Sequence, residues 1–322
     1  MRIVLFLILL SICTVVSKGQ IVYVCTSSLK GKFHVTPDCH ALQNCGGTIK
    51  RTNAATMRSK GRQACKICSA DLSKPSKNRG TVHGISQVVS SKDFNTRGLE
   101  LAKTAKGRVA QVIKHVGYTT CYNSSWLIPN WVAYELTKSK AHGTFPRPRK
   151  EFEPDPMVKG KSASHYDYSN SGYSRGHMAP AADMKWSEKA MLESFYLSNI
   201  CPQNTELNNV VWERLEDRCR ALANDGSVYI CCGPIVSPKP TRIGVNKVAV
   251  PTKFFKVLCM RRRGKWQAIG FLFPNTSCKG SMFDYAVSVD EVEKVTGHDF
   301  FSNLPDNIEK AIESSWKMKD WQ

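Results

Sequence analysis

The sequence predicts an α+β protein in which strands pair mainly with their neighbours along the chain. Runs rich in aromatic and β-branched residues indicate strands at 117–137, 227–236, 248–260 and 266–274. Amphipathic helical patterns lie at 186–197, 205–223, 289–295 and 306–317. Because strands and helices do not alternate regularly, the pattern favours a central antiparallel sheet over a doubly wound parallel one.

Composition limits the classes of partner. The chain has 322 residues and 42% apolar content, which is enough for a packed core. It carries 46 Lys and Arg against 26 Asp and Glu, a formal charge of +20. This excess favours a polyanionic partner, such as nucleic acid, an anionic membrane or an acidic polysaccharide, over a merely soluble basic protein.

The first 19 residues are typical of a signal peptide. Arg2 precedes an apolar run over 3–16, which is too short for a transmembrane helix, and small residues then allow cleavage before Gln20. We therefore expect a secreted or periplasmic protein without stable membrane insertion. Lipid attachment at Cys13 is the weaker alternative, because Ile12 fits that signal poorly.

A Cys/His-rich segment over 20–70 predicts a small separate module. Five of the chain's 13 cysteines lie there, namely Cys25, Cys39, Cys45, Cys65 and Cys68. Two thiolates at Cys-x2-Cys spacing converge on one tetrahedral ion, so Cys65 and Cys68, with His34 and Cys39, are candidate ligands of a structural Zn²⁺. The pattern resembles small zinc-ribbon-like modules. Cys25 and Cys45 would then be a spare pair for a disulfide, and a module held by disulfides alone is the alternative.

Residues 71–107 separate this module from the rest. The stretch "SKPSKNRGTVHG" at 73–84 is polar, basic and interrupted by Gly and Pro, as linkers are. The following "LELAKTAKGRVAQVIKH" at 99–115 has an uncertain helical pattern. We place the start of the main domain at 108 and its end at 322.

Two motifs carry candidate chemistry. The stretch "GYSRGHMAPAADM" at 172–184 follows a loop-like segment and presents His177 beside Arg175. The predicted helix over 205–223, capped by Asn204 or Thr205, carries Asn208, Glu216 and Arg220. In α-helical geometry Asn208 and Glu216 are about 12 Å apart along the axis and about 80° apart around it.

These residue types suit phosphodiester hydrolysis. A neutral histidine can act as general base, amide and carboxylate oxygens suit Mg²⁺, and arginines bind phosphate. Each residue alone has a commoner structural explanation, since loop histidines are usually hydrogen-bonded and helical Glu–Arg pairs are usually solvated.

Several stretches together resemble the DNA/RNA non-specific endonucleases of the ββα-metal type, which include secreted bacterial nucleases and endonuclease G. These are "SRGHMAPAADMKWS", "FYLSNICPQNTELNNVVWERLED", "VPTKFFKV" and the late "YAVSVDEVEKVTGHDFFSNLP". The resemblance covers about 108–318 and leaves out 1–90. It implies a ββα-metal nuclease domain with a central antiparallel sheet.

The resemblance also implies roles for individual residues. His177 matches the general base, and Asn208 matches the single direct protein ligand of Mg²⁺. Glu216 matches the residue that orients the waters of the ion, and Arg220 matches a phosphate-binding arginine.

An upstream arginine is expected as well. Arg149 is our choice, although Arg147 is close enough to compete, and Arg175 is expected to support the site. The commonest form of the motif begins with Asp where this chain has Ser174, which removes a carboxylate near the base.

The sequence therefore predicts a secreted, Mg²⁺-dependent endonuclease that cuts DNA and RNA to leave 5′-phosphates, with Mn²⁺ as a substitute ion. The charge of +20 supplies sequence-independent binding to phosphates. The alternatives are a non-catalytic nucleic-acid-binding protein on a nuclease fold and a surface protein that binds acidic glycans. A homodimer is compatible with the sequence but not predicted by it.

Overall fold

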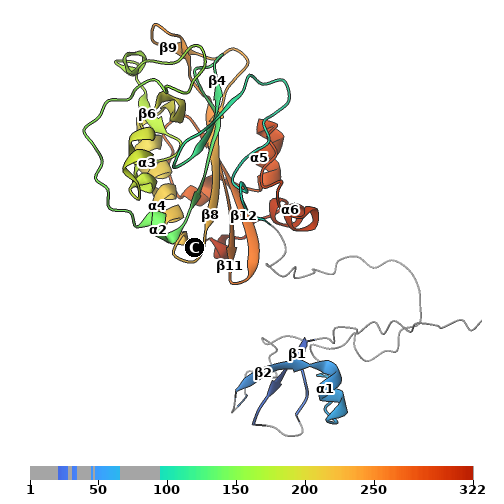
Figure 1. The fold of residues 1–322 in the computed structure, drawn as a ribbon. Helices are drawn as coiled ribbons and strands as arrows, with labels where there is room; N and C mark the ends of the chain where they lie inside the picture. Colours follow the sequence, from blue (N-terminus) through green and yellow to red (C-terminus); the bar gives the residue numbers. More distant parts are fainter. Residues whose placement is uncertain (1–20, 28–30, 35–44, 46–47, 66–94, 322) are drawn as a thin grey trace, which may run out of the picture. The chain divides into compact units, whose positions relative to one another are not determined.

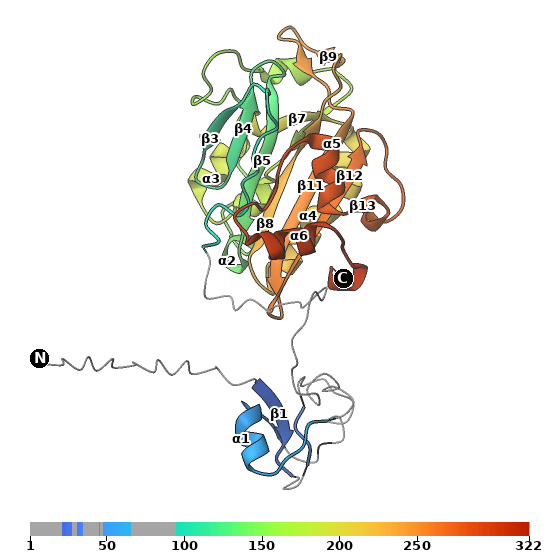
Figure 2. The same cartoon turned by 90° about the vertical axis from the view of Figure 1, so that its right-hand side faces the viewer.

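The structure is a computed structural model that describes residues 21–27, 31–34, 45, 48–65 and 95–321 (Figures 1 and 2). The chain divides into two compact units, Met1–Ser86 and Gln87–Gln322. The predicted signal peptide, Cys13 included, and most of the predicted linker lie outside the described residues.

The N-terminal unit is built on one hairpin and one short helix. Strands β1 (Ile21–Cys25) and β2 (Ile49–Asn53) pair antiparallel, and α1 (Ala54–Ser59) follows directly. A small apolar core lies between them, formed by Val22, Val24, Phe33, Ala54 and Met57. Cys25 and Cys45 form a disulfide, which confirms the pairing expected for these two residues.

Two of the four proposed zinc ligands lie in the described part of this unit. Phe33 pairs with Ala64 as a parallel bridge, and the Cys65 N–H donates to the carbonyl of Phe33 at 2.9 Å. His34 and Cys65, which directly follow the bridged pair, are therefore neighbours. Cys39 and Cys68 lie outside the described residues, so the zinc site stays a prediction.

The C-terminal unit contains a seven-stranded antiparallel sheet in the order β13-β12-β11-β8-β5-β4-β3. Its strands are β3 (Gln111–Lys114), β4 (Thr119–Asn123), β5 (Ile128–Leu136), β8 (Val228–Ile235), β11 (Lys253–Arg262), β12 (Lys265–Pro274) and β13 (Ala286–Val287). Two small sheets accompany it, β6 (Ser174–His177) with β7 (Ile200–Gln203) and β9 (Arg242–Ile243) with β10 (Val248–Ala249). This confirms the α+β class and the central antiparallel sheet.

Helices cover both faces of this sheet (Figure 1). The α-helices are α2 (Lys138–Ala141), α3 (Glu188–Glu193), α4 (Glu213–Leu222), α5 (Val289–Thr296) and α6 (Asp306–Glu313). A π-helix, η6 (Leu207–Trp212), runs directly into α4. Short 3-10 turns are η3 (His165–Tyr168), η4 (Ala181–Met184), η5 (Leu197–Asn199), η7 (Met282–Tyr285) and η8 (Met318–Asp320).

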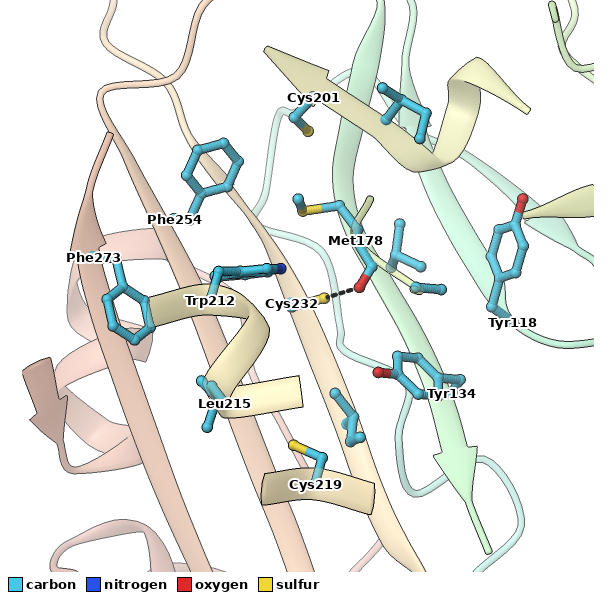
Figure 3. Close-up of a cluster of buried hydrophobic side chains, with 14 of the residues drawn as sticks. Tyr118, Tyr134, Met178, Cys201, Trp212, Leu215, Cys219, Cys232, Phe254 and Phe273 are labelled. Carbon is cyan, nitrogen blue, oxygen red and sulfur yellow. Dashed lines mark hydrogen bonds between the residues drawn. The ribbon is translucent and has the colours of Figure 1, made fainter. Parts of the chain in front are cut away.

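Alternation along the central strands divides the core in two. In β8, Ile230 and Cys232 belong to the cluster under α4, whereas Tyr229 and Cys231 belong to the cluster under α5 and α6. We call these the α4 face and the α5/α6 face. The predicted buried stripe of the long helix is confirmed, since Val211, Trp212, Leu215, Cys219 and Leu222 are all buried on the α4 face (Figure 3).

The segment before β3 differs from its prediction. Residues 99–115 form turns, extended chain and β3 instead of a helix. Residues 95–107 also pack onto the main unit instead of forming a linker. Lys103 pairs with Asp299 as a β-bridge, and the Trp131 indole N–H donates to Thr104 Oγ1 at 2.9 Å. These long-range contacts outweigh the weak helical pattern of the segment.

Candidate active site

His177 is held at the end of a strand. We expected a loop histidine, but Ser174–His177 is β6, and His177 pairs with Ile200 of β7. The hydroxyls of Ser174 and Thr205 are 2.9 Å apart, which joins the start of β6 to the start of the long helix. Ser174 stands where the commonest motif has Asp. Its hydroxyl therefore joins the hairpin of β6 and β7, which carries His177, to the helix that carries the other candidate residues.

The surroundings of His177 are aromatic and leave one ring nitrogen unused. Its ring lies 5.2 Å from the ring of Phe152 and 5.5 Å, edge on, from that of Phe195. Nε2 is buried and has no hydrogen-bond partner among the described residues. Burial, with a smaller contribution from the charge of Arg147, lowers the pKa of His177 to about 3. The ring is therefore neutral at pH 7 and keeps a free acceptor.

Asn199 fixes the chain that follows His177. Its backbone carbonyl accepts from the Met178 N–H, and its side chain both accepts from and donates to the backbone of Ala179 at 2.8 and 2.9 Å. The carbonyl of Met178 also accepts from the thiol of Cys232 on β8 (Figure 3). Sequence reasoning did not assign Asn199, although it lies in the quoted "SNICPQN" stretch.

The helix over 205–222 begins in π geometry. Asn204 Oδ1 accepts from the N–H groups of Glu206 and Leu207, which confirms the predicted cap. The π segment Leu207–Trp212 contains Asn208, so the α-helical angle expected between Asn208 and Glu216 does not apply. The side-chain amide of Asn208 donates to Asn209 Oδ1 at 2.7 Å, which leaves Asn208 Oδ1 free to bind a cation. Single π turns inside helices are frequent at functional sites.

Glu216 lies against a buried lysine that sequence reasoning missed. Lys256 in β11 is fully buried, its Nζ is 3.8 Å from Glu216 Oε1, and it lies 4.1 Å from the centre of the Trp212 ring. Burial raises the pKa of Glu216 to about 7, and Lys256 opposes this rise. The sequence feature that indicates burial of Lys256 is the alternation of β11, because Lys256 points to the same side of the strand as the buried Phe254 and Leu258.

Arg220 is held by carboxylates rather than free in solvent. It donates to Asp183 Oδ1 at 2.7 Å and to Asp217. Asp183 is fully buried and also accepts from the hydroxyl of Tyr134 at 2.9 Å. Asp183 lies near the end of the stretch 172–184 that contains His177. This ion pair is therefore a second connection between that stretch and α4.

The three other candidate arginines differ in position. The Arg147 guanidinium lies 5.2 Å from the centre of the Phe195 ring, and its charge reaches His177. Arg175 donates to the carbonyl of His165 at 2.8 Å and lies over the rings of Phe152 and Tyr168. The structure thus places Arg147 beside His177, whereas it provides no corresponding contact for Arg149.

The donor set fits a hard divalent cation. Asn208 offers an amide oxygen and Glu216 offers a carboxylate, and the ammonium of Lys256 lies beside that carboxylate. Oxygen ligands in small number suit Mg²⁺, which keeps several of its waters.

Comparison with known proteins identifies the family of this chain. The family model of DNA/RNA non-specific endonucleases matches residues 100–307. The mitochondrial nuclease EXOG of Xenopus laevis is 38% identical over 208 residues, which are 59% of this chain and 58% of that protein. Mitochondrial endonuclease G of Bos taurus is 34% identical over 220 residues, which are 64% of this chain and 74% of that protein.

A solved structure is also similar. The crystal structure of an EndoG/EndoGI complex matches with a TM-score of 0.58 and 30% identity, over 61% of this chain and 88% of that chain. The chain spans less than two thirds of the length of the EXOG relatives it matches. Because the family model covers more than half of the sequence, this chain belongs to the DNA/RNA non-specific endonuclease family.

Proposed function

We propose that this chain is a metal-dependent endonuclease that hydrolyses phosphodiester bonds in both DNA and RNA. The observation that carries the proposal is the neutral, partly exposed ring of His177, on a hairpin bonded to the helix that bears Asn208, Glu216 and Arg220.

The chain's own residues divide the work. Asn208 Oδ1 would bind the ion directly, and Glu216 would hold its waters. When bound, Mg²⁺, or Mn²⁺ in its place, supplies positive charge that offsets the charge developing on the phosphate and the leaving oxygen. His177 takes a proton from water, the resulting hydroxide attacks phosphorus as the bond to the 3′-oxygen breaks, and the 3′-oxygen takes up a proton from solvent. The products are a 5′-phosphate and a 3′-hydroxyl.

Positive groups around the site favour the charged forms of its carboxylates, against the larger effect of burial. Lys256 favours the charged form of Glu216, and Arg220 favours that of Asp183. Since Arg220 is already bonded to Asp183, we propose that it binds phosphate with its remaining donors, together with Arg147. Arg175 packs over the ring of Phe152 and so stabilises the hairpin of β6 and β7.

Recognition of substrate is electrostatic in this proposal. The formal charge of +20 attracts phosphates of any sequence, and the reaction uses no 2′-hydroxyl. DNA and RNA are therefore both expected as substrates, and binding should weaken steeply with salt.

The destination of the chain is a separate proposal. We propose export, because the apolar run after Arg2 and the Cys25–Cys45 disulfide both fit an oxidising compartment. The relatives named above are mitochondrial proteins, which makes mitochondria the competing destination. Among the described residues, no helix is long and apolar enough to cross a membrane. Fractionation with N-terminal sequencing separates the two, and export predicts a mature chain that begins at Gln20.

We also propose that the N-terminal module binds Zn²⁺ through His34, Cys39, Cys65 and Cys68. The neighbouring positions of His34 and Cys65 support it. Elemental analysis of the full chain should find zinc at unit stoichiometry that is lost when Cys65 and Cys68 are both replaced by Ser. A zinc-free protein without free thiols in this module would support disulfides instead.

Digestion of plasmid DNA and of RNA, with Mg²⁺ and with EDTA, tests the proposed activity. We expect both polymers to be cut with Mg²⁺ and neither with EDTA, and the new ends to carry 5′-phosphates. Binding without cleavage under all conditions would favour the non-catalytic alternative.

A further inference from the structure

A cluster of three carboxylates lies on the α5/α6 face, away from the residues of the active site. Asp290 and Glu293 lie three residues apart on α5, and Glu313 ends α6. Their ligand oxygens all lie within 4.8 Å of one another. Figures 1 and 2 both show α5 and α6 as neighbours on the sheet. The proposed catalysis uses none of these residues.

Glu313 is unusual because it is buried and incompletely bonded. Only 5% of its surface is exposed, and its Oε1 has no hydrogen-bond partner among the described residues. Glu293, by contrast, accepts the N–H of Phe300 at 2.9 Å. A buried carboxylate oxygen without a donor is costly, and here it belongs to a side chain that faces two other carboxylates.

The charges around Glu313 are negative. Burial, followed by the charges of Glu293, Glu309 and Asp290, raises the pKa of Glu313 to about 9. Lys103 bonds to Asp299 at 2.9 Å instead and is largely exposed. Within the described residues, the cluster therefore has carboxylates from two helices and no ammonium or guanidinium group bonded to it.

The spacing of the oxygens suits one calcium ion. Calcium binds carboxylate oxygens at about 2.4 Å, so two oxygens on the same ion can be at most about 4.8 Å apart. The three side chains thus need little movement to share an ion, and water and further carboxylate oxygens can complete its shell. We infer that Asp290, Glu293 and Glu313 form a structural Ca²⁺ site that fastens α6 to α5.

Such a site would stabilise the fold without taking part in catalysis. Ile312, next to Glu313, and Val289 and Val292 of α5 lie in the same apolar cluster. An ion between the helices would take the place of the proton that Glu313 carries at neutral pH, and its binding energy would add to the stability of the folded state.

Thermal unfolding of the full chain with and without Ca²⁺, after treatment with a chelator, tests the inference. At a hundred-fold excess over Kd, we expect Ca²⁺ to raise the wild-type Tm by roughly 5 to 10 °C. Glu313→Gln should fold in metal-free buffer with a Tm close to that of the wild type, because Gln has the shape of the neutral acid that Glu313 forms at pH 7. It should then show little or no response to Ca²⁺.

Two further variants locate the ion. Asp306→Asn changes an exposed acid of α6 outside the cluster and should respond to Ca²⁺ like the wild type. Asn208→Ala should also keep the response, because the proposed catalytic ion lies on the other face. With saturating Mg²⁺, Glu313→Gln should cut plasmid DNA at the wild-type rate.

The inference is wrong if Ca²⁺ leaves the wild-type Tm unchanged, or if Glu313→Gln responds as strongly as the wild type. A response that disappears in Asn208→Ala and persists in Glu313→Gln would assign the binding to the catalytic site instead. Failure of DNA cleavage in the wild type would contradict the proposed function without affecting this inference.

Discussion

The two faces of the central sheet bury carboxylates in opposite ways. On the α4 face, Glu216 lies beside Lys256, and Asp183 is bonded to Arg220. On the α5/α6 face, Glu313 lies among other acids. Buried charge is stable only when it is paired, and on the α4 face a cation lies beside each of these carboxylates. The second face leaves room for a cation from solution.

Removing the proposed metal ligand of the α4 face should have the largest effect on activity. Asn208→Ala deletes the amide oxygen, and several kcal/mol of charge stabilisation correspond to a loss of about 10³-fold in cleavage rate. Excess Mg²⁺ should rescue it only partly. Asn209→Ala is the matched control and should lose much less, since Asn209 only positions the Asn208 amide. Undiminished Mg²⁺ affinity of Asn208→Ala by calorimetry would point to another ligand.

Breaking the lysine–glutamate pair should have the largest effect on stability. Lys256→Met leaves Glu216 buried without its cation and should cost about 3 to 5 kcal/mol at pH 8. The raised pKa of Glu216, about 7, should rise further without Lys256, because Lys256 lowers it. The destabilisation should therefore shrink as the pH falls towards 5.5 and Glu216 takes up a proton.

Urea unfolding at the two pH values measures this change. The double variant with Glu216→Gln removes both charges and should recover much of the lost stability. A pH-independent loss in Lys256→Met would contradict the pairing.

A buried histidine on the α5/α6 face should make the fold sensitive to acid. His298 Nδ1 accepts the Ala105 N–H at 3.0 Å, and burial, together with Arg108, lowers its pKa to about 4. Since the folded pKa is below the ordinary value near 6.5, stability is complete above pH 6.5 and falls as the pH decreases towards 4. The loss from this group is on the order of 3 kcal/mol.

The variant His298→Asn keeps an acceptor for Ala105 and does not titrate. Its stability should decline less between pH 6.5 and 4 than that of the wild type, measured by urea unfolding. Equal slopes for the two proteins would mean that folding does not lower the pKa of His298.

The smallest effect concerns the two upstream arginines. Arg147 lies beside Phe195 and His177, so Arg147→Ala should lower kcat/KM by about 10- to 100-fold, the value of one charged hydrogen bond to phosphate. Arg149→Ala should change it by less than about 3-fold, as exposed charges usually do. The reverse order would restore Arg149 as the phosphate-binding residue.

Sequence patterns predicted what depends on local periodicity and failed where distant contacts decide. The long helix, its Asn204 cap and its buried stripe are local features and are confirmed. The segment before β3 has a weak helical pattern but forms no helix, because contacts such as that of Trp131 with Thr104 determine its conformation. The π geometry around Asn208 also leaves no simple signal in composition.

The missed site residues are those whose role comes from packing. Lys256 is one charged residue within an apolar strand, and only the assembled sheet shows that it faces Glu216. Asp183 is likewise one acid within a quoted motif, and only the folded structure shows that Arg220 of α4 is bonded to it. His177, by contrast, can be proposed from the sequence alone, because its motif is contiguous.

The rate of plasmid cleavage by His177→Ala, at saturating Mg²⁺ and with its Tm recorded in parallel, tests the central claim most directly. His177 offers a neutral ring, so its removal should lower the rate at least about 10²-fold, the usual contribution of a general base. The Tm and the affinity for DNA should change little. A folded variant that cuts DNA at nearly the wild-type rate would contradict the assignment of His177 as the base.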